Sequence, residues 1–274
     1  MRSIIKYTVS IFSILLFAIN INAQDSFFSN GLNVGIKGGA SILLAEVPSD
    51  FSHKINEFEN KVGFAIDAEL SKYLSNHWEI AIEFNYSVLN GETQYPSFSA
   101  EGHHPVHIEP ITEPVEYNNT LTGSRIFFRF YLTSLANRKE GVSLYPFISA
   151  GIGYLNYKST FQYIDEIPTG SNKIIFSKGY DNSASLTTVN YSVGGGLKTT
   201  LSSKLYIISS INGNIVPYDF LDVVHNYDAI GNRLSILGLY TQFKIGIFYS
   251  LTPFTPGQGR SKKSTGPTHL PFGQ

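Results

Sequence analysis

The sequence predicts an all-β fold, an eight-stranded antiparallel transmembrane β-barrel, and three observations lead to this prediction. Eight segments alternate apolar and polar residues over about ten or more positions each, which is the period of a strand with two different faces. The connections between these segments are alternately short and long. Beyond an apolar N-terminal stretch there is no second long apolar run, so a helical membrane protein does not fit.

The composition narrows the class further. The chain has 274 residues, with 20 Lys and Arg against 21 Asp and Glu, so it lacks the basic surplus that nucleic-acid binding requires. Cysteine is absent, which excludes a disulfide framework, a thiolate metal site and a cysteine nucleophile. The mean hydropathy of −0.02 suits a soluble all-β protein or a membrane barrel equally well. We expect no cofactor and no nucleic-acid partner.

The N-terminal residues 1–23 have the features of a cleaved signal peptide. Arg2 and Lys6 form a basic region, an apolar run covers Thr8 to Ile19, and the small Ala23 precedes the expected cut. An uncleaved anchor helix is the alternative. Residues 24–31 are then a short periplasmic segment, and residues 32–252 form the barrel.

The eight alternating segments lie between residues 32 and 251. They begin at Leu32, Val62, Trp78, Leu121, Leu144, Thr188, Lys204 and Ile236. The first, "LNVGIKGGASIL", alternates apolar residues with Asn33, Lys37 and Ser41. The second, "VGFAIDAELSKYL", alternates them with Asp67 and Glu69. Each segment therefore has one apolar face and one polar or charged face.

The third and fourth segments carry opposite charges. In "WEIAIEFNYSV" the apolar residues alternate with Glu79 and Glu83, and in "LTGSRIFFRFYL" they alternate with Arg125, Arg129 and Tyr131. Because residues two or four positions apart lie on the same face of a strand, each pair of charges shares one face.

The last four segments are "LYPFISAGIGYLNY", "TVNYSVGGGLKTTL", "KLYIISSINGNI" and "ILGLYTQFKIGIFYSL". Glycines are frequent in the fifth and sixth segments, and the eighth sets Ile245 and Ile247 against Gln242 and Lys244. A tilted strand needs about 9–11 residues to cross a bilayer, and all eight segments are long enough.

The connections predict the orientation of the barrel. Short turns are expected at 75–77 and 202–204 and a moderate one at 133–142, whereas long polar loops are expected at about 46–61, 90–119, 159–187 and 216–233. Short turns in the periplasm and long loops outside are typical of outer-membrane barrels. An extra hairpin inside a long loop is an alternative. The weak alternation over 173–180 indicates strand structure above the membrane.

The two faces must meet different surroundings. Lipid cannot satisfy a free sheet edge, so the sheet has to close, with its apolar and aromatic face toward lipid and its charged face inside. An eight-stranded barrel has an interior just wide enough for side chains. The charged residues expected inside are Lys37, Asp67, Glu69, Glu79, Glu83, Arg125, Arg129, Lys198 and Lys244.

These charges predict a lumen network. Buried carboxylates without partners are costly, so we expect Arg125 and Arg129 to bridge carboxylates of the third segment, Glu79 and Glu83 first, and to plug the lumen. The inward glycines that make room for the long side chains are expected to be Gly63, Gly151, Gly153, Gly194 and Gly196. The aromatic residues expected at strand ends or on lipid faces, as membrane-interface girdles, are Tyr73, Trp78, Tyr86, Tyr154, Tyr191 and Tyr249.

The signal peptide, the eight segments and "LYPFISAGIGYLNY" together resemble the small outer-membrane barrels of the OmpA/OmpX-like porin superfamily, and more narrowly the PorT-type group. The resemblance covers the chain from Leu32 to Leu251 as a pattern. It implies localisation in the outer membrane of a Gram-negative bacterium, with outer-membrane lipid as a partner.

The final strand resembles a barrel-assembly signal. In "KIGIFYSL" the residues that match this signal are Lys244, Gly246, Tyr249 and Leu251. The resemblance implies that the barrel-assembly machinery reads this strand during insertion.

The tail, residues 253–274, departs from the family because many such barrels end at the last strand. It is rich in Pro and Gly and contains "RSKK". It is too short for a peptidoglycan-binding domain, so the anchoring function of OmpA is not transferred. A disordered tail and a peptide that docks, through "HLPFG", into a periplasmic or membrane protein partner are both open.

Few residues indicate chemistry. His103, His104 and His107 lie close together with two glutamates in "EGHHPVHIEP", which could bind zinc or copper, although a flexible loop whose histidines never converge is the alternative. A lipid-modifying enzyme would need a serine, a histidine and an orienting carboxylate or amide, and nothing in the spacing of His53 or His225 favours that. We therefore expect no catalytic, cofactor or metal residues.

The predicted function is that of a non-enzymatic outer-membrane barrel, structural or accessory. It would present extracellular loops for binding or serve as a subunit of an envelope complex for secretion or assembly, as the PorT-type resemblance implies. A small solute pore is the main alternative, and an outer-membrane lipid-modifying enzyme is a more distant one.

Overall fold

The computed structural model describes residues 31–48, 58–97, 111–135, 143–164, 174–178, 186–217 and 234–252, with parts of 221–232. The predicted signal peptide and the tail at 253–274 lie outside these residues. Within the described part of the chain, no helix is long and apolar enough to cross a membrane. The strands are β1 (Leu32–Pro48), β2 (Glu59–Lys61), β3 (Gly63–Tyr73), β4 (Trp78–Thr93), β5 (Val115–Tyr131), β6 (Ser143–Tyr163), β7 (Ile174–Lys178), β8 (Leu186–Thr200), β9 (Leu205–Val216) and β10 (Ile236–Ser250).

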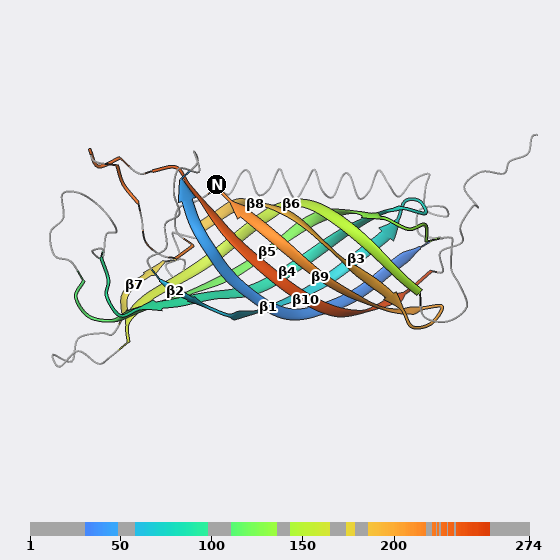
Figure 1. Cartoon of the computed structure of the whole chain (residues 1–274), viewed down its shortest axis with the longest axis horizontal. Coiled ribbons are helices and arrows are strands. Elements are labelled where there is room, and N and C mark those ends of the chain that lie inside the picture. The colour runs from blue at the N-terminus through green and yellow to red at the C-terminus, as the bar shows by residue number, and fades with distance from the viewer. Residues whose placement is uncertain are drawn as a thin grey trace, which may run out of the picture.

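Eight of these strands close into an antiparallel barrel, as the sequence predicts (Figure 1). Around the ring the order is β1, β3, β4, β5, β6, β8, β9 and β10, and β10 pairs with β1 to complete the circle. The first and last strands pair from Asn33 with Ser250 to Pro48 with Ile236. Because the ring is closed, the spanning strands leave no unpaired edge to hydrocarbon, which is the condition for a sheet to cross a bilayer.

The two remaining strands extend the barrel on the side of the long loops. β2 pairs with Asn90–Glu92 of β4, and β7 pairs with the end of β6. Both lie at the left end of Figure 1. Together with residues 88–93 of β4, 115–120 of β5 and 158–163 of β6 they form a five-stranded sheet, which we call the extracellular sheet.

The outer surface changes character along the strands. Around the barrel it is apolar and exposed, as at Ile36 (65% exposed), Phe84 (60%) and Ile247 (60%). On the extracellular sheet the same outward positions become polar, for example Asn118 and Lys158. A soluble protein rarely exposes so much continuous apolar surface, so the apolar band faces lipid and the extracellular sheet lies beyond it.

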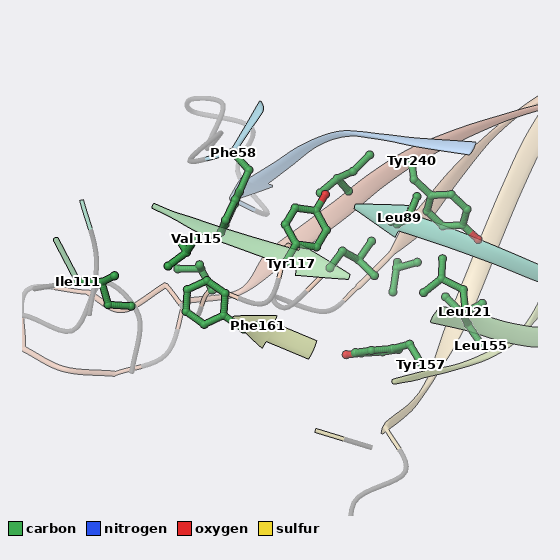
Figure 2. Packing of buried hydrophobic residues seen from close by; sticks show 14 residues of the cluster. Phe58, Leu89, Ile111, Val115, Tyr117, Leu121, Leu155, Tyr157, Phe161 and Tyr240 are labelled. Carbon is green, nitrogen blue, oxygen red and sulfur yellow. The ribbon is translucent and has the colours of Figure 1, made fainter. Parts of the chain in front are cut away.

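An apolar cluster fills the lumen at the long-loop end (Figure 2). It consists of Leu43, Phe58, Leu89, Ile111, Val115, Tyr117, Leu121, Leu155, Tyr157, Phe161, Val216, Leu221, Val224 and Tyr240. Leu221 and Val224 belong to the last long loop, which enters the mouth of the barrel. Glu46 accepts a hydrogen bond from the Leu221 N–H at 2.5 Å, and Asn119 donates to the Leu221 carbonyl at 3.1 Å. We call this set the upper cluster.

A second cluster fills the lumen at the short-turn end, and we call it the lower cluster. Its members are Tyr73, Tyr131, Leu135, Tyr145, Phe147, Tyr206, Ile208 and Phe248. The sequence prediction that Tyr73 belongs to an outer girdle is wrong, because its side chain is 6% exposed and faces inward. Tyr73 occupies the same face of β3 as Asp67 and Glu69, so the alternation of the strand sends it into the lumen. Trp78, Tyr86, Tyr154, Tyr191 and Tyr249 are exposed on the outer face.

The predicted loops were too long. β4 continues to Thr93 and β5 begins at Val115, although 90–119 was predicted to be a loop, and β6 continues to Tyr163. These strands extend beyond the bilayer because the extracellular sheet buries apolar residues on its inner face. Strand β7 falls within the weakly alternating stretch at 173–180.

Inward glycines provide room for large side chains. A Cβ atom placed on Gly153 would lie 2.5 Å from Cβ of Arg125, and one placed on Gly246 would lie 2.4 Å from Cγ of Lys37. A Cβ atom placed on Gly35 would lie 2.3 Å from the ring of Phe248. A Cβ atom placed on the outward Gly38 would have no other atom within 4 Å. An added carbon at these inward positions would therefore force neighbouring atoms to move.

We expect Gly35→Ala to destabilise the barrel by about 1–3 kcal/mol, because the added methyl group overlaps the Phe248 ring and forces it to move. Urea unfolding of the refolded protein in detergent micelles, followed by tryptophan fluorescence of Trp78, measures this change. Gly38→Ala on the same strand is the matched control and should leave the midpoint almost unchanged. Equal effects of the two substitutions would contradict the assignment of faces.

Candidate functional site

The candidate site is the charged middle layer of the lumen, between the upper and lower clusters. Its charged side chains are Lys37, Asp67, Glu69, Glu79, Glu83, Arg125, Arg129 and Lys244, each of them at most 3% exposed. They come from five neighbouring strands, β10, β1, β3, β4 and β5. Each strand contributes residues of a single face, so the parity of the strands places all eight inside.

Glu83 lies at the centre of this network. It is opposite Glu69 on β3 and opposite Arg125 on β5 in the strand register. Two carboxylates directly opposite each other repel, so a cation is needed between them. Lys37 supplies it: its Nζ pairs with Glu83 and lies 2.8 Å from Oε2 of Glu69. Lys244 adds a second ammonium group 3.5 Å from Oε1 of Glu83.

Asp67 is enclosed by the same two lysines. Lys244 forms an ion pair with Oδ2 of Asp67, and Nζ of Lys37 lies 3.5 Å from that oxygen. Lys37 therefore contacts three carboxylates. Lys244 is fully buried and also donates a hydrogen bond to Oε1 of Gln242 at 3.2 Å.

Arg125 joins this network to the far wall of the barrel. Its Nε donates to Oε1 of Glu83 at 2.5 Å, its Nη1 donates to Oδ1 of Asn214 at 2.6 Å, and its Nη2 donates to Oε1 of Gln242 at 3.0 Å. The guanidinium group also lies over the ring of Phe127, 4.8 Å from its centroid. Since β5 and β9 are not neighbours in the sheet, this arginine bridges the lumen.

Arg129 makes a bidentate pair, but with a different carboxylate from those expected first. Its Nη1 and Nη2 donate to the two oxygens of Glu69 on β3 at 2.5 and 2.6 Å. Glu79, the residue opposite it on β4, is at the longer distance of 3.3 Å. Glu79 instead accepts hydrogen bonds from the Tyr131 hydroxyl at 2.6 Å and the Ser71 hydroxyl at 2.5 Å. The structure thus brings together Arg125 with Glu83, and Arg129 with both Glu69 and Glu79.

The network is electrically balanced. Four carboxylates, Asp67, Glu69, Glu79 and Glu83, face four cations, Lys37, Arg125, Arg129 and Lys244. Charges buried at this depth are tolerated when they are paired and hydrogen-bonded. A cavity of about 10 Å³ lies beside Lys37, Arg129 and Ser149, which is room for about one water molecule. The middle layer is filled by side chains.

Lys198 is the ninth of the charged residues expected inside, and it behaves differently. In the described part of the chain it has no ion pair, and it lies within the lower cluster instead. Its Nζ is 3.9 Å from the ring centroid of Tyr206 and 4.3 Å from that of Tyr73. Aromatic faces attract a cation, so the tyrosine rings take the place of a carboxylate.

The polar faces predicted from the sequence include Tyr131 and Gln242, but only charged residues were assigned to the network, so the role of its neutral members was missed. Asn214, Gln242, Tyr131 and Ser71 provide hydrogen bonds that complete the coordination of Arg125 and Glu79. The parity of each segment places these residues on the inward face, and this signal identifies them. Which of them reaches across the lumen depends on the curvature of the barrel.

The remaining predicted site residues are those of the assembly signal and the candidate metal ligands. On β10, Lys244 and Gly246 point into the lumen, while Tyr249 and the adjoining Leu251 are exposed on the outer face. Their reading by an assembly machinery stays a prediction. The candidate metal ligands His103, His104 and His107 lie outside the described residues.

We expect Glu83→Gln to destabilise the folded barrel by about 3–5 kcal/mol, because it leaves Lys37, Lys244 and Arg125 facing each other without their shared carboxylate. Urea unfolding in detergent micelles or lipid vesicles measures the loss. Lys61→Gln removes the exposed ion pair of Lys61 with Glu92 and serves as the control, with an expected change of at most about 1 kcal/mol. A Glu83→Gln protein as stable as the control would show that the network contributes no stability.

Comparisons with known proteins find similarity in solved structures. No model of a known protein family matches the chain, and no curated protein matches its sequence. The N-terminal barrel domain of Pseudomonas aeruginosa OprF is 13% identical, with 79% of this chain and 96% of that chain covered and a TM-score of 0.35. Neisserial surface protein A (NspA) is 8% identical, with 81% and 97% covered and a TM-score of 0.41. The outer membrane protease OmpT from Escherichia coli is 11% identical, with 82% and 98% covered and a TM-score of 0.38.

Similarity at this level carries no residue role to this chain. The class rests on features of the chain itself: the closed ring of eight strands, the apolar outer band and the neutralised charged interior. The narrower PorT-type resemblance stays a prediction. The chain is a small eight-stranded β-barrel of the outer membrane.

Proposed function

We propose that this barrel is a non-enzymatic and non-conducting outer-membrane protein that holds an extracellular sheet and its loops above the membrane for binding, or as a subunit of an envelope complex. The observation that carries the proposal is the filled lumen. The upper cluster, the charged network and the lower cluster follow one another along the barrel axis. Function then lies on the outside of the molecule.

The lumen offers no route for solutes through its described part. Arg125 spans the interior between Glu83 and Asn214, and the upper cluster includes Leu221 from the last long loop. An eight-stranded barrel is just wide enough for its own side chains. These features support a sealed barrel over a small solute pore.

The extracellular sheet supports a binding role. It has an apolar inner face (Figure 2), where Phe58 packs edge-on against Tyr117 at 4.9 Å between ring centroids. Its outer face is polar. The extra strands β2 and β7 pair with β4 and β6 and extend the sheet beyond the apolar band. A loop turn at the mouth is ordered as well: Asp228 accepts hydrogen bonds from the N–H groups of Ile230 and Asn232, which hold its pKa below the ordinary value.

The enzymatic alternative lacks support in the described residues. The lipid-modifying site considered from the sequence needs a histidine next to a serine nucleophile. His77 lies in a periplasmic turn, where its Nδ1 is 2.8 Å from the carbonyl of Tyr131 and its ring stacks on Phe130. These contacts assign it a structural role. His53 and His225 lie outside the described residues.

We expect the purified protein to give no stable conductance steps in planar lipid bilayers, because all three layers of the lumen are filled. A 16-stranded porin in the same membrane is the positive control. Reproducible steps from the pure, folded protein would favour the pore.

The choice between a lone binding barrel and a subunit is tested by affinity purification from native membranes under mild detergent. If the barrel is a subunit, defined proteins should co-purify in fixed ratio, and the same proteins should be lost when surface loops of the extracellular sheet are replaced. Recovery of the barrel alone would favour the lone binding protein. Full-length protein and a variant without Thr255 to Gln274 are compared, to test whether the tail recruits a partner.

A further inference from the structure

The outer face of the extracellular sheet contains a polar hollow of about 540 Å³. This volume lies within the range of about 300–1,000 Å³ that is usual for small-molecule sites. The hollow crosses strands β2, β4, β5 and β6, just above the apolar band. Its polar lining side chains are Lys61, Asn90, Glu116, Asn118, Thr160 and Gln162.

The strand register explains why these side chains gather. Asn90 pairs with Lys61 on one side and with Asn118 on the other, and Asn118 pairs with Thr160. The residues therefore form one straight row across four strands. Directly opposite residues in a sheet have Cβ atoms about 4.5–5.5 Å apart, so the row presents closely spaced amide, hydroxyl and ammonium groups.

The charges in and around the hollow are already engaged with each other. Lys61 forms an ion pair with Glu92, and this hydrogen bond raises the pKa of Lys61 above its ordinary value. Gln162 donates a hydrogen bond to Glu116 at 2.6 Å. Glu92 and Glu116 are opposite each other in the register, so the rim repels anions. A neutral ligand suits this site better than a phosphate or a sulfate.

One acceptor in the hollow has no partner. Oδ1 of Asn90 is buried and accepts no hydrogen bond from the described residues. A buried acceptor without a partner is unfavourable, and a ligand hydroxyl at this position would donate the missing hydrogen bond. The amides of Asn118 and Gln162 and the hydroxyl of Thr160 offer further donors and acceptors nearby.

We propose that this hollow binds a neutral, hydroxyl-rich carbohydrate. Sugar hydroxyl groups both donate and accept, which matches a lining of amides, one hydroxyl and a carboxylate, and their lack of charge matches the balanced rim. The site faces outward directly above the lipid-facing band, and the sugars of an outer-leaflet glycolipid and a free oligosaccharide present the same chemistry. The inference rests on the proposed binding function and names its ligand class.

The test uses full-length protein refolded in detergent micelles and two sets of probes. One is the neutral part of the core oligosaccharide released from the cell's own outer-leaflet glycolipid, freed of its acidic sugars and phosphates. The other is an array of neutral di- to tetrasaccharides from other sources. Isothermal titration measures the dissociation constant of each probe that is retained. Saturable binding of the core oligosaccharide alone assigns the site to the membrane's own sugars, and binding of array members alone assigns it to free saccharides.

Two variants locate the site. The double variant Asn90→Ala with Asn118→Ala should weaken binding by about ten-fold or more, because several hydrogen bonds are lost together. Asn156→Ala is the matched control, since Asn156 lies on the outer face of β6 outside the hollow and donates a hydrogen bond to Thr187 at 3.2 Å. The control should bind like the unchanged protein. The mobility of unheated samples in gel electrophoresis verifies that each variant is folded.

The inference is overturned if the folded protein binds neither probe set, or if Asn156→Ala weakens binding as much as the double variant does. The conductance measurement is independent of both results. A sealed barrel that binds no sugar would therefore reject this ligand class and leave the sealed binding platform standing, whereas a conducting barrel would reject the platform itself.

Discussion

The rest of the structure depends on one constraint: inside a bilayer, every polar group must find its partner within the protein. For the backbone, this is met by closing the sheet, with β10 paired along nearly the full length of β1. For the side chains, it is met by the neutral network around Glu83. The two solutions are coupled, because closing the sheet is what brings Arg125 on β5 within reach of Asn214 on β9.

The network is confined between two apolar layers, and this arrangement strengthens it. The upper and lower clusters limit the access of water, so each ion pair acts in a medium of low dielectric constant. The same exclusion would make any unpaired charge costly. At the lower end the buried charge of Lys198 is stabilised differently, because two tyrosine rings rather than a carboxylate lie next to its ammonium group. The lumen is thus built like the core of a soluble protein, with a polar layer in its middle.

The outer surface divides the molecule at the membrane boundary. Along β4 the outward residues change from Phe84 and Tyr86 to Asn90 and Glu92. Beyond this point the inner face of the sheet stays apolar, so the strands continue to pair without lipid. That continuation creates the extracellular sheet and, on its outer face, the hollow. A sealed barrel with a rigid sheet above it places any binding function outside the lumen.

Much of the fold follows from the sequence because a strand has a period of two. The same parity that places Glu79 and Glu83 on one face places Ile80 and Ile82 on the other, and it predicted which charged residues lie inside the barrel. The alternation of β3 also predicts the position of Tyr73, which lies on the same face as Asp67 and Glu69 and therefore points inward. The prediction that Tyr73 belongs to the outer girdle was wrong because it relied on the aromatic residue type and not on the alternation of the strand.

By itself, the sequence determined the number of spanning strands, the inward face of the charged residues and the need for opposite charges to pair inside. The tertiary structure alone decided which charges pair, since Arg129 reaches past its direct neighbour Glu79 to form its bidentate contact with Glu69. It also decided that strands β4, β5 and β6 extend into a sheet above the membrane. The physical reason is that parity is a local property of each strand, whereas distances across the lumen and the packing of the upper cluster depend on how the closed barrel tilts and curves.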